Sequence, residues 1–136
     1  MMEDIKEIVK WYELQKNAVE DAELRVGFSF PESLSYIYRK YGYGFVVNQE
    51  GAINRLIDPM TCADIRLRED VYEFDSDLEL YASFEKDKML FFEVNEGVYL
   101  SIGIEDGKIY YLNKQIADNI FEFIMKISNN PDYWCE

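Results

Sequence analysis

The sequence predicts an α+β fold: a mostly antiparallel sheet flanked by helices, with an N-terminal helical pair and a C-terminal helix. Apolar residues recur with helical spacing in two stretches near the N-terminus and in one near the C-terminus. Short apolar segments separated by turn residues, a pattern typical of strands, fill the region between them. Because no strand–helix–strand alternation recurs, we do not expect a parallel doubly wound sheet.

The first predicted helix covers residues 3–22. Gly27 and the alternating residues after it end the helical pattern. The apolar residues that define the first face recur at i, i+3, i+4 and i+7: Ile5, Ile8, Val9 and Tyr12. We therefore expect one amphipathic helix before Gly27.

The stretch FPESLSYIYRKYGYGFV, residues 30–46, predicts the second helix, over residues 31–41. Pro31 suits the first turn of a helix, and Gly42 stands where a left-handed C-terminal cap is required. The glycines of YGYG follow a helix, whereas a phosphate-binding loop places its glycines after a strand and before a helix. We interpret YGYG as the end of a helix and expect no cofactor.

The middle of the chain predicts strands and one uncertain connection. Residues 45–57 indicate two short strands around a turn at 48–51, and a short helix is expected to begin near Thr61. The charged stretch 67–88 fits either a helix or an irregular acidic connection.

The C-terminal part predicts a three-stranded antiparallel meander followed by a closing helix. Residues 89–112 form the meander, with the hairpin signal Asp106-Gly107 as its second turn. Asn113 and Asp118 are both good N-cap residues, so the closing helix is expected to begin between them.

Composition excludes several classes of function. The chain has 136 residues, a net charge of −13 and no histidine. The missing imidazole removes Ser-His-Asp and Cys-His catalysis and most zinc sites. The negative charge repels nucleic acid and anionic membranes and attracts a basic protein partner. Cys62 and Cys135 are too few for a disulfide framework, and no apolar run approaches a membrane span, so we expect a cytoplasmic protein.

Four segments in order resemble the SUKH superfamily, the Smi/Knr-type domains. The first, residues 24–44, is similar to the family's Pro-initiated helix and its glycine turn. The others are INRLIDP at 53–59, the hairpins at 89–113 and the helical stretch at 116–124. The segment MLFFEVNEG is more apolar than in many relatives, which puts a ligand or partner surface there in doubt. The resemblance implies a single SUKH-like domain over residues 1–136.

The resemblance also implies a function in binding proteins, without catalysis. Many bacterial members are similar to immunity proteins, which neutralise a cognate toxin of a contact-dependent or secreted polymorphic system. An acidic immunity protein would mimic the field of nucleic acid if that toxin is a nuclease. The alternative is a regulatory scaffold of the Smi/Knr type, which binds cellular proteins or a small ligand in a groove beside the sheet.

The candidate partner-binding residues lie mainly in one acidic stretch. Between residues 69 and 79, six of eleven residues are acidic, and none is basic. Such a run is either a solvated surface or a docking surface for a basic toxin. Tyr43, between two glycines, is expected on an exposed turn. The candidates in the stretch are Glu69, Asp70, Tyr72, Glu73, Phe74, Asp75, Asp77 and Glu79.

No metal site is expected in this stretch. Asp75, Asp77 and Glu79 alternate as the carboxylates of an EF-hand loop do. The sixth position is however Leu80 where glycine is required, and the twelfth is Lys86 where a bidentate Glu belongs. The pattern therefore does not predict a calcium-binding loop.

Overall fold

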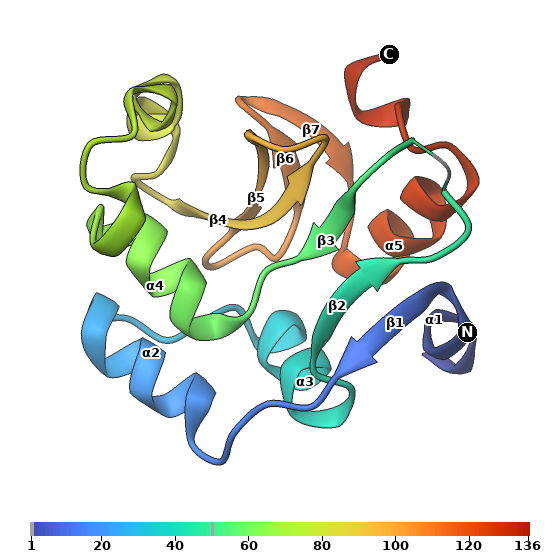
Figure 1. Ribbon diagram of the computed structural model, residues 1–136, viewed down its shortest axis with the longest axis horizontal. Helices are drawn as coiled ribbons and strands as arrows, with labels where there is room; N and C mark the ends of the chain where they lie inside the picture. The colour runs from blue at the N-terminus through green and yellow to red at the C-terminus, as the bar shows by residue number, and fades with distance from the viewer. Residues whose placement is uncertain (1, 50) are drawn as a thin grey trace.

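The computed structural model describes residues 2–49 and 51–136. The described residues form a seven-stranded sheet in which the strands follow one another in chain order, with each neighbouring pair antiparallel (Figure 1). The strands are β1 (Val9–Tyr12), β2 (Tyr43–Val46), β3 (Asn54–Leu56), β4 (Lys88–Val94), β5 (Val98–Gly103), β6 (Ile109–Tyr111) and β7 (Lys114–Ala117). The predicted α+β class, with an antiparallel sheet flanked by helices, is confirmed.

Helices precede and follow the sheet and fill two of its connections. The α-helices are α1 (Met2–Ile8), α2 (Ala18–Val26), α3 (Glu32–Lys40), α4 (Pro59–Leu67) and α5 (Ile120–Asn129). Three 3₁₀ helices are η1 (Asp70–Tyr72), η2 (Ser76–Phe84) and η3 (Tyr133–Cys135). Two helices, α2 and α3, lie between β1 and β2, whereas α4, η1 and η2 lie between β3 and β4.

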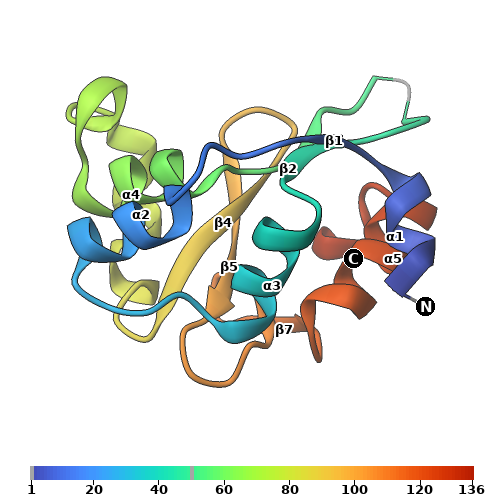
Figure 2. The ribbon, with the colours of Figure 1, turned by 90° about the horizontal axis from the view of Figure 1, so that it is seen from below.

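One face of the sheet, the inner face, carries α3 and α5, which both lie below β1 and β2 in Figure 2. Trp11 of β1 stacks on Tyr41 at the end of α3, with ring centroids 5.1 Å apart. Phe92 of β4 meets Phe123 of α5 edge to face, with centroids 4.8 Å apart. Since successive strand residues point to opposite faces, the neighbours of Trp11 and Phe92 form a separate outer face.

The outer face is covered only in part. Tyr99 of β5 packs edge to face against Tyr81 of η2, with centroids 5.8 Å apart, and its backbone N–H donates to the Tyr81 hydroxyl at 3.0 Å. Over β1 and β2, by contrast, Tyr12 and Phe45 remain 38% and 39% exposed. The sheet is thus closed on the outer side at β5 and open at β1 and β2.

The prediction of a single helix over residues 3–22 is wrong. The chain forms α1, then β1, then α2, and β1 pairs with β2 from Val9↔Val46 to Tyr12↔Tyr43. Ile5 and Val9 have helical spacing, but Val9 and Trp11 also alternate with Lys10 and Tyr12 as strand residues do. Pairing with β2 selects the strand, because β preference depends on the neighbouring strand more than on local sequence.

The second helix is confirmed as α3, and its end has the predicted geometry. The backbone N–H groups of Tyr41 and Gly42 both donate to the carbonyl of Ile37, at 2.8 and 3.1 Å. Gly42 has φ of 108°, a conformation that glycine adopts without strain. The YGYG sequence therefore ends a helix, as predicted, and leads directly into β2.

The middle of the chain agrees with the prediction in its strands and helix. The predicted strand pair is β2 and β3, and α4 begins after Asp58, whose carboxylate accepts a hydrogen bond from the Thr61 N–H at 3.1 Å. The uncertain stretch 67–88 contains two 3₁₀ helices and no continuous α-helix. Val71 and Phe74, two of the four residues of the supposed apolar face, are exposed, so no continuous apolar face forms there.

The C-terminal meander has one more strand than predicted. Lys114–Ala117 forms β7, paired with β6, in the region where the closing helix was expected to begin. The N-cap of α5 is Asn119, whose side chain accepts a hydrogen bond from the Glu122 N–H at 2.9 Å. Neither Asn113 nor Asp118 caps the helix, because sheet pairing continues through residue 117.

The contact between β1 and β2 predicts a marked effect of a methyl group at Gly44. An added Cβ would lie 1.8 Å from the Lys10 carbonyl oxygen, so the strands would have to separate. We expect Gly44→Ala to lower the free energy of unfolding by about 2–4 kcal/mol in chemical denaturation. Gly51→Ala is the control, since its Cβ would meet no atom within 4 Å and only the φ of 74° is unfavourable. Equal losses of stability in the two variants would contradict the close approach.

Candidate functional site

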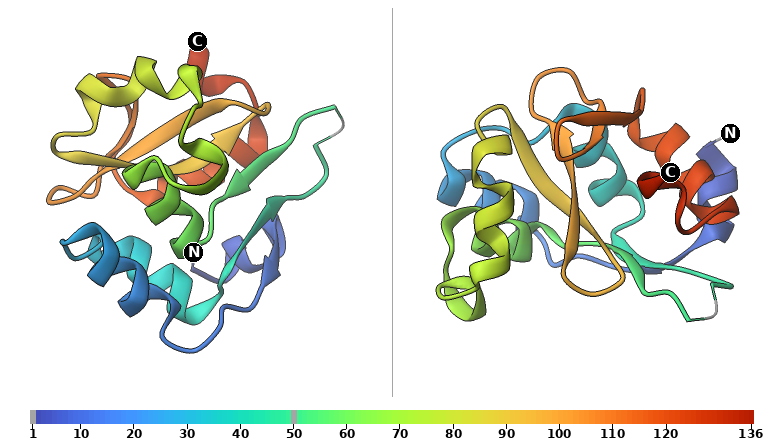
Figure 3. Two further views of the ribbon diagram at one scale, coloured as in Figure 1. Left: turned by 60° about the vertical axis from the view of Figure 1, so that its left-hand side comes forward. Right: turned by 90° about the horizontal axis from the view of Figure 1, so that it is seen from above.

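The acidic segment, residues 69–79, forms an outlying part of the molecule. It comprises η1, a turn and the beginning of η2. In Figure 1 and in the right-hand view of Figure 3 it lies at the end of the molecule away from α5 and the chain termini. The stretch 67–88 is thus a surface projection on the sheet and contributes only part of its length to the core.

Arginine side chains tie this projection to the body. The Arg68 guanidinium pairs with the carboxylate of Glu85 and donates to the carbonyl oxygens of Leu78 and Ile65, at 3.3 and 2.5 Å. On α2, Arg25 bonds Asp64 at 2.7 Å and Glu69 at 2.6 Å. The segment is therefore held at both ends and presents its side chains in a defined arrangement.

Most of the candidate residues in the segment face solvent, and Glu69, Asp70, Glu73, Phe74, Asp77 and Glu79 are exposed. Phe74 is 89% exposed and Val71 is 76% exposed, so large apolar side chains stand among the carboxylates. Asp75 is half-buried and accepts a hydrogen bond from the Asp77 N–H at 3.0 Å, which caps η2. Asp75 thus has a structural role in capping η2, whereas the Phe74 side chain stands in solvent.

Tyr72 of the segment turns toward the sheet. It is half-buried, and burial raises the pKa of its phenol, while the nearby Arg55 guanidinium opposes that rise. Arg55 itself bonds Glu93 across β3 and β4 at 2.7 Å. Tyr72 therefore connects the acidic segment to the outer face of the sheet.

The prediction that Tyr43 lies on an exposed turn is wrong. It begins β2, pairs with Tyr12 of β1 and is half-buried. Its ring lies 5.6 Å from that of Tyr12, which in turn meets Phe45 edge to face at 6.3 Å. We call Tyr12, Tyr43 and Phe45 the aromatic ladder. The short β2 strand starts immediately after Gly42, and this takes Tyr43 into the sheet.

The aromatic ladder and the acidic segment lie on the same face of the sheet. Strand register places Lys10, Phe45, Arg55 and Glu93 in one row across β1 to β4, and Tyr72 lies beside Arg55. Tyr12 and Phe45 are not among the partner-binding residues predicted from the sequence. The sequence contains a strand signal in the alternation of residues 9–12 and of residues 43–46. This alternation brings Tyr12 beside Tyr43 and Phe45 only if the two stretches pair, and the sequence does not show that they do.

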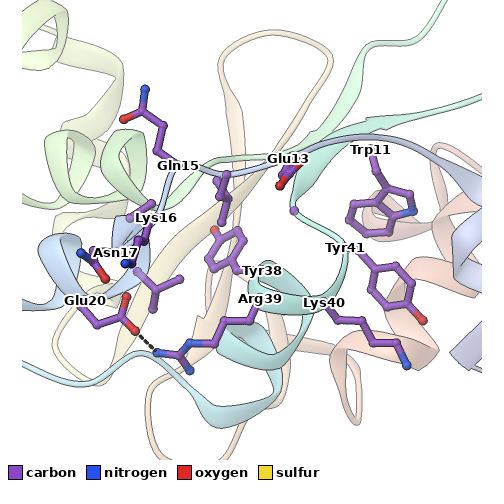
Figure 4. A pocket seen from close by; sticks show the side chains of 14 residues that line it. Trp11, Glu13, Gln15, Lys16, Asn17, Glu20, Tyr38, Arg39, Lys40 and Tyr41 are labelled. Atoms are coloured by element: carbon purple, nitrogen blue, oxygen red, sulfur yellow. Dashed lines mark hydrogen bonds and ion pairs between the residues drawn. The ribbon is translucent and has the colours of Figure 1, made fainter.

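A groove lies on the other side of β1, between residues 13–20 and the end of α3 (Figure 4). Trp11 and Tyr41 stack at one end, and Arg39 pairs with Glu20 at 3.0 Å. The pKa of Glu20 is lowered, first by a hydrogen bond from its own backbone N–H and then by Arg39. The lining mixes both charge signs, and Lys40 contacts the Tyr41 ring at 5.7 Å.

Cys62 is packed as a small apolar residue. Its thiol lies 3.4 Å from the Tyr38 hydroxyl, which bonds the Ile57 carbonyl, and burial raises the pKa of Cys62 to about 12. Within residues 2–49 and 51–136, no group of three or more acidic or cysteine side chains is arranged to hold a metal ion. Among the same residues no helix is long and apolar enough to cross a membrane.

Comparison with known proteins identifies the family of this fold. Residues 13–131 match the SMI1 / KNR4 family (SUKH-1). The chain belongs to this family. It is also 36% identical over 129 residues to the immunity protein YxxD of Bacillus subtilis (strain 168), an alignment that covers 93% of this chain and 88% of the relative. The resemblance seen in the sequence is therefore confirmed, and the matched region includes both the acidic segment and most of the aromatic ladder.

The anchoring of the acidic segment predicts that Arg68→Ala destabilises the protein. Glu85, whose side chain is only 8% exposed, would lose its partner. We expect a loss of about 2–3 kcal/mol in unfolding free energy and faster amide hydrogen exchange in residues 69–84. The control is Arg39→Ala, because the Arg39–Glu20 pair is 53% exposed on both sides and solvent screens it, so its loss should change stability little. An equal effect of the two variants would show that Arg68 does not hold the segment.

The two cysteines are expected to differ in reactivity. At pH 8 the Cys62 thiol remains protonated because its pKa is raised to about 12, and it is buried, whereas Cys135 is exposed. A thiol reagent should therefore modify Cys135 rapidly in the folded protein and Cys62 only after denaturation. The variant Cys135→Ser should show no rapid reaction, and rapid modification of that variant would contradict the packing of Cys62.

Proposed function

We propose that this protein is an immunity protein that binds and neutralises a cognate toxin of a polymorphic or contact-dependent system. The observation that carries the proposal is the 36% identity, over nearly the whole chain, to a protein named as an immunity protein. Membership of the SMI1 / KNR4 family agrees with this role. The protein acts by forming a complex, in the cytoplasm, as a single domain and without a catalytic step.

The acidic segment is the proposed docking surface for the toxin, together with Tyr43. Its exposed carboxylates would attract a basic partner and steer its approach, and Phe74 offers an apolar anchor among them. A net charge of −13 extends this attraction over the molecule. If the toxin is a nuclease, the same field imitates that of its nucleic-acid substrate. The proposed residues are Glu69, Asp70, Tyr72, Glu73, Phe74, Asp75, Asp77, Glu79 and Tyr43.

The first test is co-expression with the toxin domain encoded beside this protein, taken from the C-terminal part of a large secreted protein. Rescue of growth and a complex on size-exclusion chromatography are the expected results. A regulatory scaffold would instead bind cellular proteins and would not rescue growth. The lack of both rescue and complex, or the lack of any such neighbouring gene, would contradict the immunity function.

Charge neutralisation then tests the acidic segment. The variant Glu73→Gln/Asp77→Asn/Glu79→Gln changes three exposed carboxylates and spares Asp75 and the Arg25–Glu69 pair. We expect the association rate with the toxin domain to fall about tenfold at low salt, with a weaker salt dependence.

The matched control for this variant is Glu13→Gln/Asp21→Asn/Glu105→Gln. It removes the same charge from exposed residues outside the segment. A fall in association rate that is equal in the two variants would assign the effect to net charge and not to the acidic segment.

A further inference from the structure

We propose that the aromatic ladder is the packed centre of the toxin interface, and that the acidic segment is its charged rim. This inference rests on the proposed immunity function and assigns a role to Tyr12 and Phe45, which lie outside the acidic stretch. It also commits the open part of the outer face to one occupant, a basic protein partner.

The ladder is a continuous aromatic surface built on paired strands. Tyr12 stands opposite Tyr43 in the β1–β2 register, with ring centroids 5.6 Å apart, and its ring meets that of Phe45 at 6.3 Å. Tyr12 and Phe45 are 38% and 39% exposed. Aromatic side chains on a strand pair are rigid and lose little conformational entropy when a partner covers them.

Comparable aromatic surfaces elsewhere in the fold are covered by the chain itself. Tyr99 on β5 is covered by Tyr81 of η2. At the far edge of the sheet, Trp134 of η3 packs on Tyr111 at 4.9 Å, and the Tyr133 hydroxyl donates to the Ile116 carbonyl of β7 at 3.1 Å. The ladder differs from these surfaces because two of its three residues, Tyr12 and Phe45, keep more than a third of their surface exposed.

The ladder is also continuous with the proposed docking surface. Phe45 pairs with Arg55, Arg55 bonds Glu93 at 2.7 Å, and Tyr72 of the acidic segment lies beside Arg55. Burial raises the pKa of Tyr99, and the charges of Glu93 and Asp75 contribute to this rise. Asp75 of the acidic segment is therefore close enough to the outer face to act on a tyrosine of β5. A partner that contacts the acidic segment and Tyr72 therefore reaches the ladder across a single row of side chains.

The charge pattern selects a basic partner over a second copy of this chain. Two chains of net charge −13 repel each other, whereas a basic protein is attracted. The row contains two cations. Arg55 is paired with Glu93 at 2.7 Å, and the Lys10 ammonium lies 5.6 Å from the centre of the Tyr12 ring, at the β1 side. The carboxylates lie at the opposite side, near η1 and η2. The basic groups of the partner should therefore face the acidic segment, and its apolar side chains should face the ladder.

Separate roles for the two regions follow from the physical chemistry of interfaces. Tyr and Phe are enriched at the packed centre, where charged residues are depleted, and loss of such a side chain mainly accelerates dissociation. Exposed charges at the rim mainly change the association rate and its salt dependence. The two regions should therefore affect different rate constants.

The test is a kinetic comparison with the neighbouring toxin domain used above. We expect Tyr12→Ala and Phe45→Ala each to raise the dissociation rate by about tenfold or more and to change the association rate by less than about twofold. The acidic-segment variant Glu73→Gln/Asp77→Asn/Glu79→Gln should show the reverse pattern. Tyr36→Ala is the matched control, because Tyr36 is 39% exposed on α3, a helix of the inner face.

The same set of variants includes a control for loss of folding. Circular dichroism and the denaturation midpoint show whether Tyr12→Ala or Phe45→Ala retains the fold. Phe45→Thr serves if alanine destabilises β2, because threonine has a high strand preference, adds no charge beside Lys10 and Arg55, and removes the aromatic surface. It should raise the dissociation rate by about as much as Phe45→Ala.

Each result has a distinct meaning. If the wild-type protein forms no complex with the toxin domain, the proposed function is wrong. If it forms the complex, and folded ladder variants dissociate like the wild type or like Tyr36→Ala, the immunity function stands and this inference is wrong. Self-association of the isolated protein that Phe45→Ala abolishes, with unchanged toxin binding, would assign the ladder to a second copy and would also overturn the inference.

Discussion

The edge-to-face packing of Phe92 on Phe123 determines which side of the sheet is closed. It joins the closing helix to the central strand β4 and, with α3, forms the inner layer. Because side chains alternate along a strand, the residues that precede and follow each inner-face residue on its strand point to the outer face. The ion pair of Arg55 and Glu93, the aromatic ladder and the contact with Tyr72 all follow from that choice of side.

The acidic segment depends on the same arrangement. It lies in the connection between β3 and β4, after α4, and projects from the sheet there. Arg68 and Glu85 close the ends of this connection, and Tyr81 and Leu78 bury its apolar side. Dense negative charge is tolerated because the remaining carboxylates stay in water, where their mutual repulsion is screened.

The proposed combination of a charged rim and an aromatic centre suits a protein that must bind its partner fast and release it slowly. Long-range attraction to a basic toxin needs only exposed charge, whereas slow dissociation needs a packed, rigid centre. In the interface proposed above, different elements would meet these two needs: a 3₁₀ projection and a strand pair, on one face of one sheet.

The sequence alone determined the α+β class, the second helix with its glycine end, the central hairpins and the acidic character of residues 69–79, because each is encoded in local spacing, turn residues or charge. Tertiary structure decided that Val9–Tyr12 and Lys114–Ala117 are strands, and that Tyr43 stands in a sheet beside Tyr12 and Phe45. These residues are far apart in the chain, and only strand pairing brings them together. Local patterns of four residues fit a helix, a turn or a strand, and the neighbouring strand selects among them.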